Sequence, residues 1–133
     1  MALQASTAVR NAMLDAVETA IGASPTLEIR SGAVPATTGT ADSGTLLASM
    51  ALPADWMANA ANGSKALSGT WSDASADASG TAAHYRIKQG VTTHLQGTVT
   101  ATGGGGDMTL DNTSIAAGQA VSITSYTLTQ SGA

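Results

Sequence analysis

Apolar residues recur with helical spacing in one N-terminal segment, residues 6–22. Four of them follow one another every fourth position, which places their side chains on one face of an α-helix. They are Val9, Met13, Val17 and Ile21. Ser6 or Thr7 is suited to cap the start of this helix, and Gly22 to end it. The pattern predicts an amphipathic helix whose apolar face either covers one end of its own domain or docks on another subunit.

From residue 26 onward, helical spacing gives way to alternation of apolar and polar residues. The alternating segments are short, and turn-forming residues separate them at intervals of about 8–12 residues. The predicted strands are 26–30, 45–52, 66–71, 81–88, 91–100, 107–110 and 120–130. This spacing is typical of an antiparallel β-sandwich. We therefore predict a mainly β fold in a single domain, 1–133, with the helix over 6–22 and the sandwich over 26–130.

Two stretches between the predicted strands have the composition of loops. Residues 31–44 are rich in turn-forming residues without periodicity, and a loop of this length is usually functional or interfacial. The glycines at 103–106 lack the Lys and the following helix that a phosphate-binding loop requires. We interpret the glycine run as a flexible hairpin tip.

The most polar of the predicted hairpins holds both histidines and two of the five basic residues of the chain. A three-residue turn over residues 89–91 keeps Tyr85 and Leu95 together on the buried face, whereas a two-residue turn would mix the faces. This odd turn pairs Arg86 with His94 and creates one polar strip, a candidate interface or contact for an anion. The polar strip consists of His84, Arg86, Lys88, His94 and Gln96.

The composition indicates a thin core and a surface with few charges. Ala, Thr, Gly and Ser fill 75 of the 133 positions, Leu, Ile and Val fill 21, and 11% of the residues are charged. Low bulk alone does not predict disorder, because that signature also needs a high net charge, and the net charge here is only −4. We interpret the composition as a Thr-rich β framework whose surface is completed by neighbouring molecules.

Charge and cysteine content argue against several classes of function. Five basic residues against nine acidic ones leave no cationic surface for several phosphates, so we expect no nucleic-acid partner. The absence of Cys removes thiolate catalysis and Cys-ligated metals. No apolar run approaches the ~18 residues of a membrane span, and no secretory signal is visible, so we expect no membrane partner.

The motifs that could carry chemistry are weak. The two histidines have no carboxylate within their hairpin, and Arg86 beside them would repel a metal cation, so no metal site is predicted. No G-x-S-x-G elbow is present, and nothing around Asp107 and Asp111 indicates a catalytic carboxylate pair. We predict that the protein is not an enzyme and uses no cofactor. The alternative, a small hydrolase or carbohydrate binder, requires a pocket near Trp56 or Trp71.

Three stretches of the chain carry a resemblance to known proteins. They are STAVRNAMLDAVETAIGASPTLEIRSGAVP, WSDASADASGTAAHYRIKQG and GTVTATGGGGDMTLDNTSIAAGQAVSITSYTLT. In these stretches, over most of residues 6–130, the chain resembles small virion structural proteins of tailed bacteriophages, above all capsid decoration (cement) proteins. The resemblance implies a jelly-roll-like β-sandwich. It also implies a homo-dimer or homo-trimer, made in the host cytoplasm, that stands on the capsid exterior and has the major capsid protein as its partner.

The same resemblance leaves a tail or fibre component as the alternative. In that role the loops 31–44, 72–80 and 101–106 would contact a host receptor. For a decoration protein, we expect the helix face, the loop 31–44 and the hairpin from Tyr85 to Gln96 to supply the contacts with the lattice and with other copies. The candidate interface residues are Val9, Met13, Val17, Ile21, His84, Arg86, Lys88, His94 and Gln96.

Overall fold

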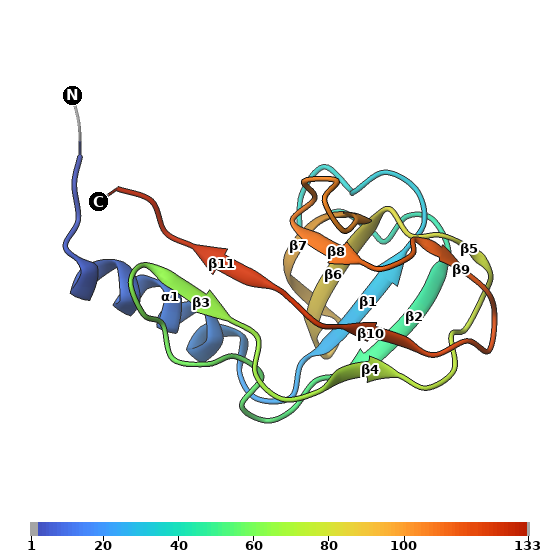
Figure 1. Ribbon diagram of the computed structural model, residues 1–133, viewed down its shortest axis with the longest axis horizontal. Coiled ribbons are helices and arrows are strands. Elements are labelled where there is room, and N and C mark those ends of the chain that lie inside the picture. The colour runs from blue at the N-terminus through green and yellow to red at the C-terminus, as the bar shows by residue number, and fades with distance from the viewer. Residues whose placement is uncertain (1–2, 133) are drawn as a thin grey trace.

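The computed structural model describes residues 3–132 and shows a mainly β fold with one N-terminal helix (Figure 1). The helix, α1 (Thr7–Ile21), begins after Ser6, whose Oγ accepts a hydrogen bond from the main-chain N–H of Val9 at 3.2 Å. It ends at Gly22, whose φ of 93° is a conformation that glycine adopts without steric cost. The helix predicted over 6–22 is confirmed.

Five of the strands form one curled sheet in the order β2-β1-β6-β7-β8, and six others pair as β10-β4, β11-β3 and β5-β9. In chain order these strands are β1 (Thr26–Arg30), β2 (Leu46–Ala51), β3 (Ser64–Ala66), β4 (Trp71–Asp73), β5 (Gly80–Thr81), β6 (His84–Gln89), β7 (Thr92–Ala101), β8 (Met108–Leu110), β9 (Ser114–Ile115), β10 (Val121–Ile123) and β11 (Thr127–Thr129). The strands predicted over 26–30 and 45–52 are confirmed to within one residue.

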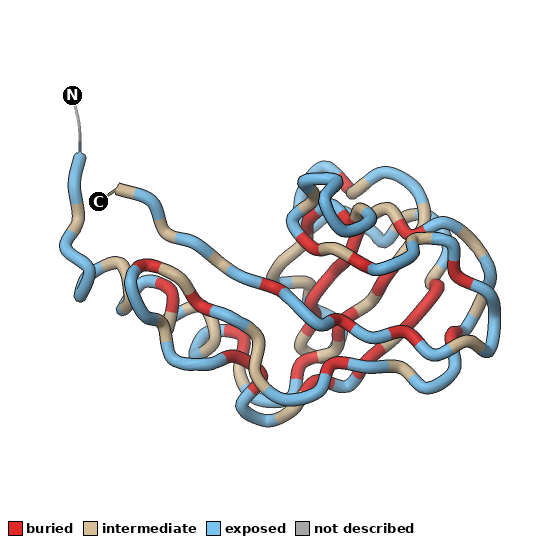
Figure 2. The backbone as a smooth tube through the Cα atoms, viewed as in Figure 1, coloured by how far each residue is buried: buried red, intermediate tan, exposed pale blue. Residues whose placement is uncertain are grey.

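The core lies against one face of the curled sheet. Leu27 and Ile29 of β1 and Ile87 of β6 are fully buried there, as the alternation of their strands requires. Figure 2 shows the buried residues concentrated along the sheet and along the segments that face it. The same apolar cluster continues through Trp56 and Trp71, so the helix end and the sheet share one core.

Strands β4 and β10, then β3 and β11, form an interrupted two-stranded ribbon that runs from the curled sheet to the helix (Figure 1). The predictions of continuous strands over 66–71 and 120–130 are therefore wrong. Gly69, with φ 73°, breaks the first strand, and the pairing register shifts by one residue between the two halves of the ribbon. At the break in the second strand, Tyr126 turns into the core.

The strand pairing also departs from the predicted all-antiparallel arrangement at β7 and β8, which are parallel. The chain returns between them through the glycine run 103–106, where Gly103 and Gly105 have φ of 87° and 81°. A Cβ at Gly104 or Gly106 would lie 2.8 Å from Thr100 atoms. The glycines therefore form a return loop that packs against Thr100 at Gly104 and Gly106, and not the hairpin tip that the sequence predicts.

Candidate functional site

The outer face of the curled sheet carries a row of charged side chains that is covered by the loop 31–44. Glu28 and Arg30 of β1 alternate with core residues. On the neighbouring strand β6, Arg86 pairs with Glu28 and His84 pairs with Arg30, and Lys88 lies on the same face opposite Thr26. Each residue of β6 from His84 to Lys88 is buried, on both faces of the sheet. The loop 31–44 is thus a cover for polar side chains, which the sequence places on a solvated or interfacial face.

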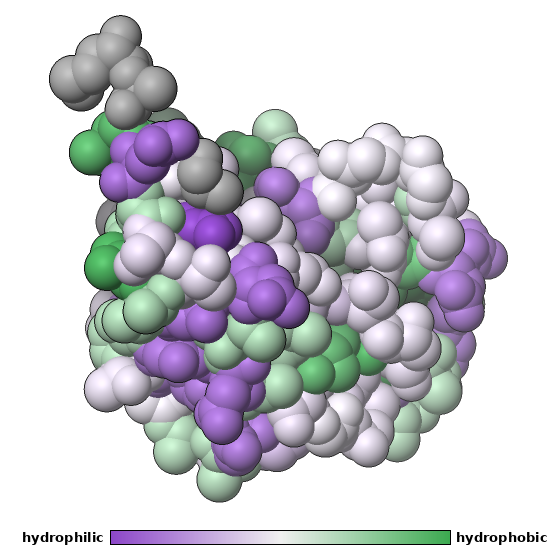
Figure 3. Space-filling model, turned by 60° about the vertical axis from the view of Figure 1, so that its left-hand side comes forward, coloured by the Kyte–Doolittle hydropathy of each residue, from purple (hydrophilic) through white to green (hydrophobic). Residues whose placement is uncertain are grey.

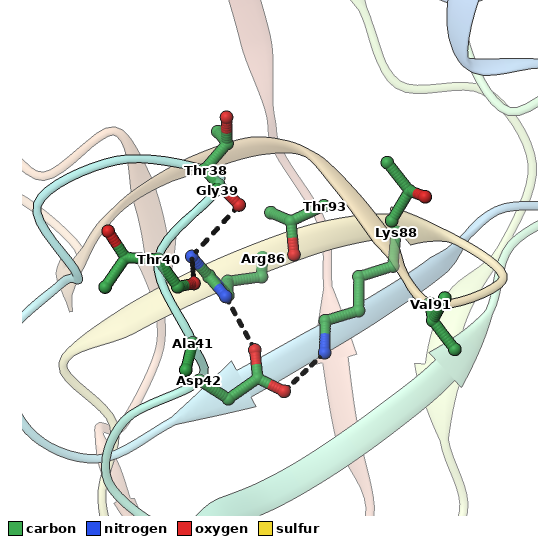
Figure 4. A pocket seen from close by; sticks show the side chains of 10 residues that line it. Thr38, Gly39, Thr40, Ala41, Asp42, Arg86, Lys88, Val91 and Thr93 are labelled. Carbon is green, nitrogen blue, oxygen red and sulfur yellow. Dashed lines mark hydrogen bonds and ion pairs between the residues drawn. The ribbon is translucent and has the colours of Figure 1, made fainter.

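Asp42, in the covering loop, is the centre of an ionic cluster (Figure 4). Its Oδ1 lies 2.7 Å from Nη1 of Arg86, and its Oδ2 lies 2.6 Å from Nζ of Lys88 and 3.3 Å from Nη2 of Arg30. Glu28 completes the cluster at 3.1 Å from Lys88 and 2.9 Å from Arg30. We call these five residues the Asp42 clamp. Hydrogen bonding from Lys88, and then from Arg86, lowers the pKa of Asp42 to about 2.

The guanidinium of Arg86 binds the loop through further contacts. It donates hydrogen bonds to the carbonyl oxygens of Thr37 and Thr40 at 3.0 and 2.9 Å, and to Oε1 of Gln96 at 2.9 and 3.1 Å. Nε2 of Gln96 in turn donates to the carbonyl oxygen of Pro35 at 2.8 Å. Arg86 and Gln96 therefore attach the loop to the sheet. The guanidinium N–H groups of Arg86 are hydrogen-bonded to partners within the chain.

A hollow of about 620 Å³ lies between the loop and the tip of the β6–β7 hairpin (Figure 4). Its walls include Thr38, Thr40 and Thr93, and three members of the Asp42 clamp also line it: Asp42, Arg86 and Lys88. These charges are paired with one another, so the hollow offers mainly hydroxyl and main-chain groups. Such a surface suits contact with another protein better than capture of a free anion.

His84 and His94, which the sequence places in one strip, lie in different environments. His84 is fully buried, and its Nδ1 lies 2.8 Å from the carbonyl oxygen of Gly32, at the start of the covering loop. Its Nε2 has no hydrogen-bond partner among residues 3–132. His94 is exposed. The structure therefore brings His84, Arg86, Lys88 and Gln96 together under the loop and leaves His94 outside.

The separation of His94 follows from the register of the hairpin. Gln89 pairs with Thr92, so the turn has two residues, and the three-residue turn predicted from sequence is wrong. A bulge beyond the turn contains His94 as its extra residue, and Arg86 then pairs with Gln96. The bulge supplies the odd residue that the prediction assigned to the turn, so Leu95 still lies beside Ile87 on the inner side.

The apolar face of α1 is divided between core and surface. Leu14 and Ile21 are 4% and 5% exposed, and Val17 packs partly against the core, whereas Val9 and Met13 are 51% and 48% exposed. Leu3, in the segment before the helix, is 82% exposed. We call Leu3, Val9 and Met13 the terminal patch. Figure 3 shows hydrophobic side chains among polar and small residues on this end of the molecule.

The second ionic cluster, which Lys65 forms with Asp15 and Glu18 of α1, has no signal in the sequence. The Lys65 Nζ lies 2.7 Å from Oδ1 of Asp15 and 3.0 Å from Oε1 of Glu18. We call these three residues the Lys65 anchor. Burial alone would lower the pKa of Lys65, but its bonds to the two carboxylates outweigh burial and raise it. A charged residue in a three-residue strand gives no local signal of this role.

Trp56 and Trp71 lie in the core, where their indole nitrogens are already bonded. The Trp56 Nε1 donates to the carbonyl oxygen of Gly22 at 3.0 Å, and the Trp71 Nε1 donates to that of Ser68 at 3.1 Å. Both side chains are at most 1% exposed. The two Trp side chains connect the end of the helix with the sheet through the shared core. Because both are buried, neither offers an exposed ring on which a sugar could stack.

Over residues 3–132, no group of three His, Asp or Glu side chains is placed to hold a metal ion. Within the same residues, no helix combines the length and apolar character needed to cross a membrane. Comparisons of the chain with protein-family models, with curated proteins and with solved structures gave no match.

Proposed function

We propose that this chain is a structural protein of a tailed-phage virion that binds the outside of the assembled capsid and bridges neighbouring capsomers. The observation that carries the proposal is the terminal patch. It exposes large apolar side chains in a chain where Leu, Ile and Val fill only 21 of 133 positions. An assembled neighbour that covers this patch would complete the apolar face of α1.

The location of the terminal patch supports an assembly contact. Val9 and Met13 lie one turn apart on the same helix face, and the N–H of Ala5 donates to the carbonyl oxygen of Gly132, which brings the two ends of the chain together there. The exposed apolar surface that Val9 and Met13 share on one helix face favours a contact with protein. We assign this contact to the major capsid protein or to other copies in a homo-dimer or homo-trimer.

A jelly-roll-like β-sandwich is part of the same proposal. The curled five-stranded sheet, faced by the β4–β10 pair across a common core, supports this architecture. A decoration protein of this kind binds only the assembled shell, so each bound copy shifts the equilibrium toward the intact lattice. Contacts that are weak singly become strong when an oligomer attaches at several points.

The test is the double substitution of Val9→Ser with Met13→Ser in the full chain, added to particles that lack the protein. Both side chains are half exposed, so we expect the variant to fold. Loss of the apolar contacts is expected to weaken capsid binding about tenfold or more, which is about 1.4 kcal/mol or more. Occupancy is measured by imaging of the particles, and folding by circular dichroism.

Ala117→Ser is the control, because Ala117 is exposed in the loop between β9 and β10 and lies outside both the terminal patch and the hollow beside the β6–β7 hairpin. It is expected to bind like the unmodified chain. Normal lattice occupancy by a folded double variant would refute the assignment of the patch. Density at the tail alone, with none on the lattice, would refute the capsid role and favour the tail component.

A further inference from the structure

A groove of about 510 Å³ separates β11 from the edge of the curled sheet. One side is formed by Leu95 and Gln96 of β7, and the other by residues 127–129 of β11, with Asp107 in the lining. We call this the β11 groove. It shares no residue with the terminal patch, so it is a separate surface.

The main chain of β11 directs alternate groups into the groove. The N–H of Leu67 donates to the carbonyl oxygen of Tyr126 at 3.0 Å, and the N–H of Gln130 donates to that of Gly63 at 2.9 Å. In an antiparallel ladder, the residues between such bonded pairs point their N–H and C=O groups to the opposite side. Thr127 and Thr129 therefore direct main-chain donors and acceptors away from β3, into the groove.

The strand on the other side of the groove has the same property. The N–H of Val99 donates to the carbonyl oxygen of Ala83, so residues 95, 97 and 99 of β7 bond toward β6, and the residues between them face away. The N–H of Thr98 is taken by Oδ2 of Asp107 at 3.0 Å. Two residues before Thr98, Gln96 directs its N–H and C=O to the groove, and its side chain is hydrogen-bonded on the other face of the sheet.

Side chains in the groove suit an extended segment with one basic residue. Leu95 and Leu128 are partly buried and offer apolar contact. Asp107 carries the only ionised side chain in the lining, and its Oδ1 has no hydrogen-bond or ion-pair partner within residues 3–132. The groove thus combines unpaired strand edges on both sides with a single negative charge.

We propose that the β11 groove binds an extended segment of another protein that carries a Lys or Arg side chain opposite Asp107. The segment adds a strand beside β11, with hydrogen bonds to Thr127 and Thr129 and contact with Gln96 across the groove. Main-chain pairing supplies the affinity, and the basic side chain selects the partner. This interaction goes beyond the proposed capsid contact, and its test uses no particle.

The probe is a short capped peptide of alternating Thr and Val with one central Lys, titrated into the isotope-labelled full chain. We expect saturable shifts of the amide signals of Gln96, Thr127 and Thr129. Two control peptides replace the Lys by Glu or carry N-methyl groups on alternate amides. Both are expected to bind about tenfold more weakly, the first through repulsion by Asp107 and the second through loss of strand pairing.

Variants of the chain separate main-chain pairing from side-chain contact. Thr129→Pro removes an N–H that faces the groove and leaves the bonds of Leu128 to β3, whereas Thr129→Ala keeps the N–H and removes only the side chain. We expect Thr129→Pro to abolish peptide binding and Thr129→Ala to preserve it. Asp107→Asn keeps an oxygen for Thr98 and is expected to remove the preference for Lys over Glu.

The peptide controls decide the test even where Thr129→Pro fails to fold. Equal affinity for the Lys and Glu peptides, or for the methylated and unmethylated peptides, would overturn the proposal. So would the absence of saturable shifts in the groove residues. Self-association of the chain that competes with the peptide would assign the groove to a second copy and overturn the proposed occupant.

Discussion

The Asp42 clamp joins a loop to the sheet, whereas the Lys65 anchor joins the helix to β3, and the two balance charge in opposite ways. The clamp holds three cations with two carboxylates, and the anchor holds one cation with two carboxylates. In both, a cation is the deeply buried member: Arg86 and Lys65 have side chains 2% and 1% exposed. Their carboxylate partners Asp42 and Asp15 are 33% and 47% exposed.

This difference in exposure determines whether a substitution leaves an unpaired charge in the interior or at the surface. A buried charge that loses its partner keeps its desolvation cost, whereas a carboxylate near the surface regains water when its partner is removed. The charge that remains after a substitution therefore matters more than the number of ion pairs that are lost.

Asp42→Ala is expected to have the largest effect. It leaves Arg86 buried with hydrogen bonds to neutral groups alone and frees the loop 31–44 from Lys88. We expect the free energy of unfolding to fall by about 3 kcal/mol, the range for a buried charge that loses its partner. The measurement is urea unfolding at neutral pH.

The control for Asp42→Ala is Asp55→Ala, which alters an exposed carboxylate and is expected to change stability by less than about 0.5 kcal/mol. Proteolysis within residues 31–44 should increase for Asp42→Ala alone. A loss of stability no larger than that of the control would show that the clamp does not hold the loop.

Lys65→Met is expected to cost less, about 1 kcal/mol, although Lys65 is as buried as Arg86. The substitution removes the buried charge itself and keeps an unbranched side chain of similar length. Asp15, with a side chain 47% exposed, then hydrates, and Glu18 keeps the hydrogen bond that it accepts from the N–H of Met57. Urea unfolding of Lys65→Met and Asp42→Ala under the same conditions compares the two losses of unfolding free energy. A cost above that of Asp42→Ala would mean that the helix contact depends on the ion pairs more than on packing.

The parts of the fold that follow from neighbouring residues could be predicted from sequence. The helix over 6–22 and the strand over 26–30 depend on local periodicity and caps, and both are confirmed. The breaks in the ribbon at Gly69 and Tyr126 depend on tertiary contacts, which form only when distant parts of the chain pack together. The bulge at His94 had no signal either, because it changes the pairing and keeps the alternation of buried residues.

Local alternation likewise predicts only part of the candidate site. Alternation along β6 brought Arg86 and Lys88 to one face, but their partner Asp42 lies 44 and 46 positions away in a loop without periodicity. The link from Lys65 to Asp15 spans 50 positions. Long-range pairing of this kind leaves no local pattern, so a buried clamp and a solvated strip look alike in sequence.

Acidification is expected to have the smallest effect and to separate the two clusters by their carboxylates. The pKa of Asp42 is about 2 in the folded chain, below its ordinary value of 3.8, and that of Asp15 is also lowered, by Lys65 and the N–H of Ala60. Because the unfolded chain takes up these protons first, stability falls as pH falls from about 4 to about 2. Asp42→Asn should flatten this acid limb more than Asp15→Asn, since Asp42 meets three cations and Asp15 meets one. Urea midpoints at stepped pH test this order, and a flatter limb for Asp15→Asn would mean that the helix anchor dominates acid stability.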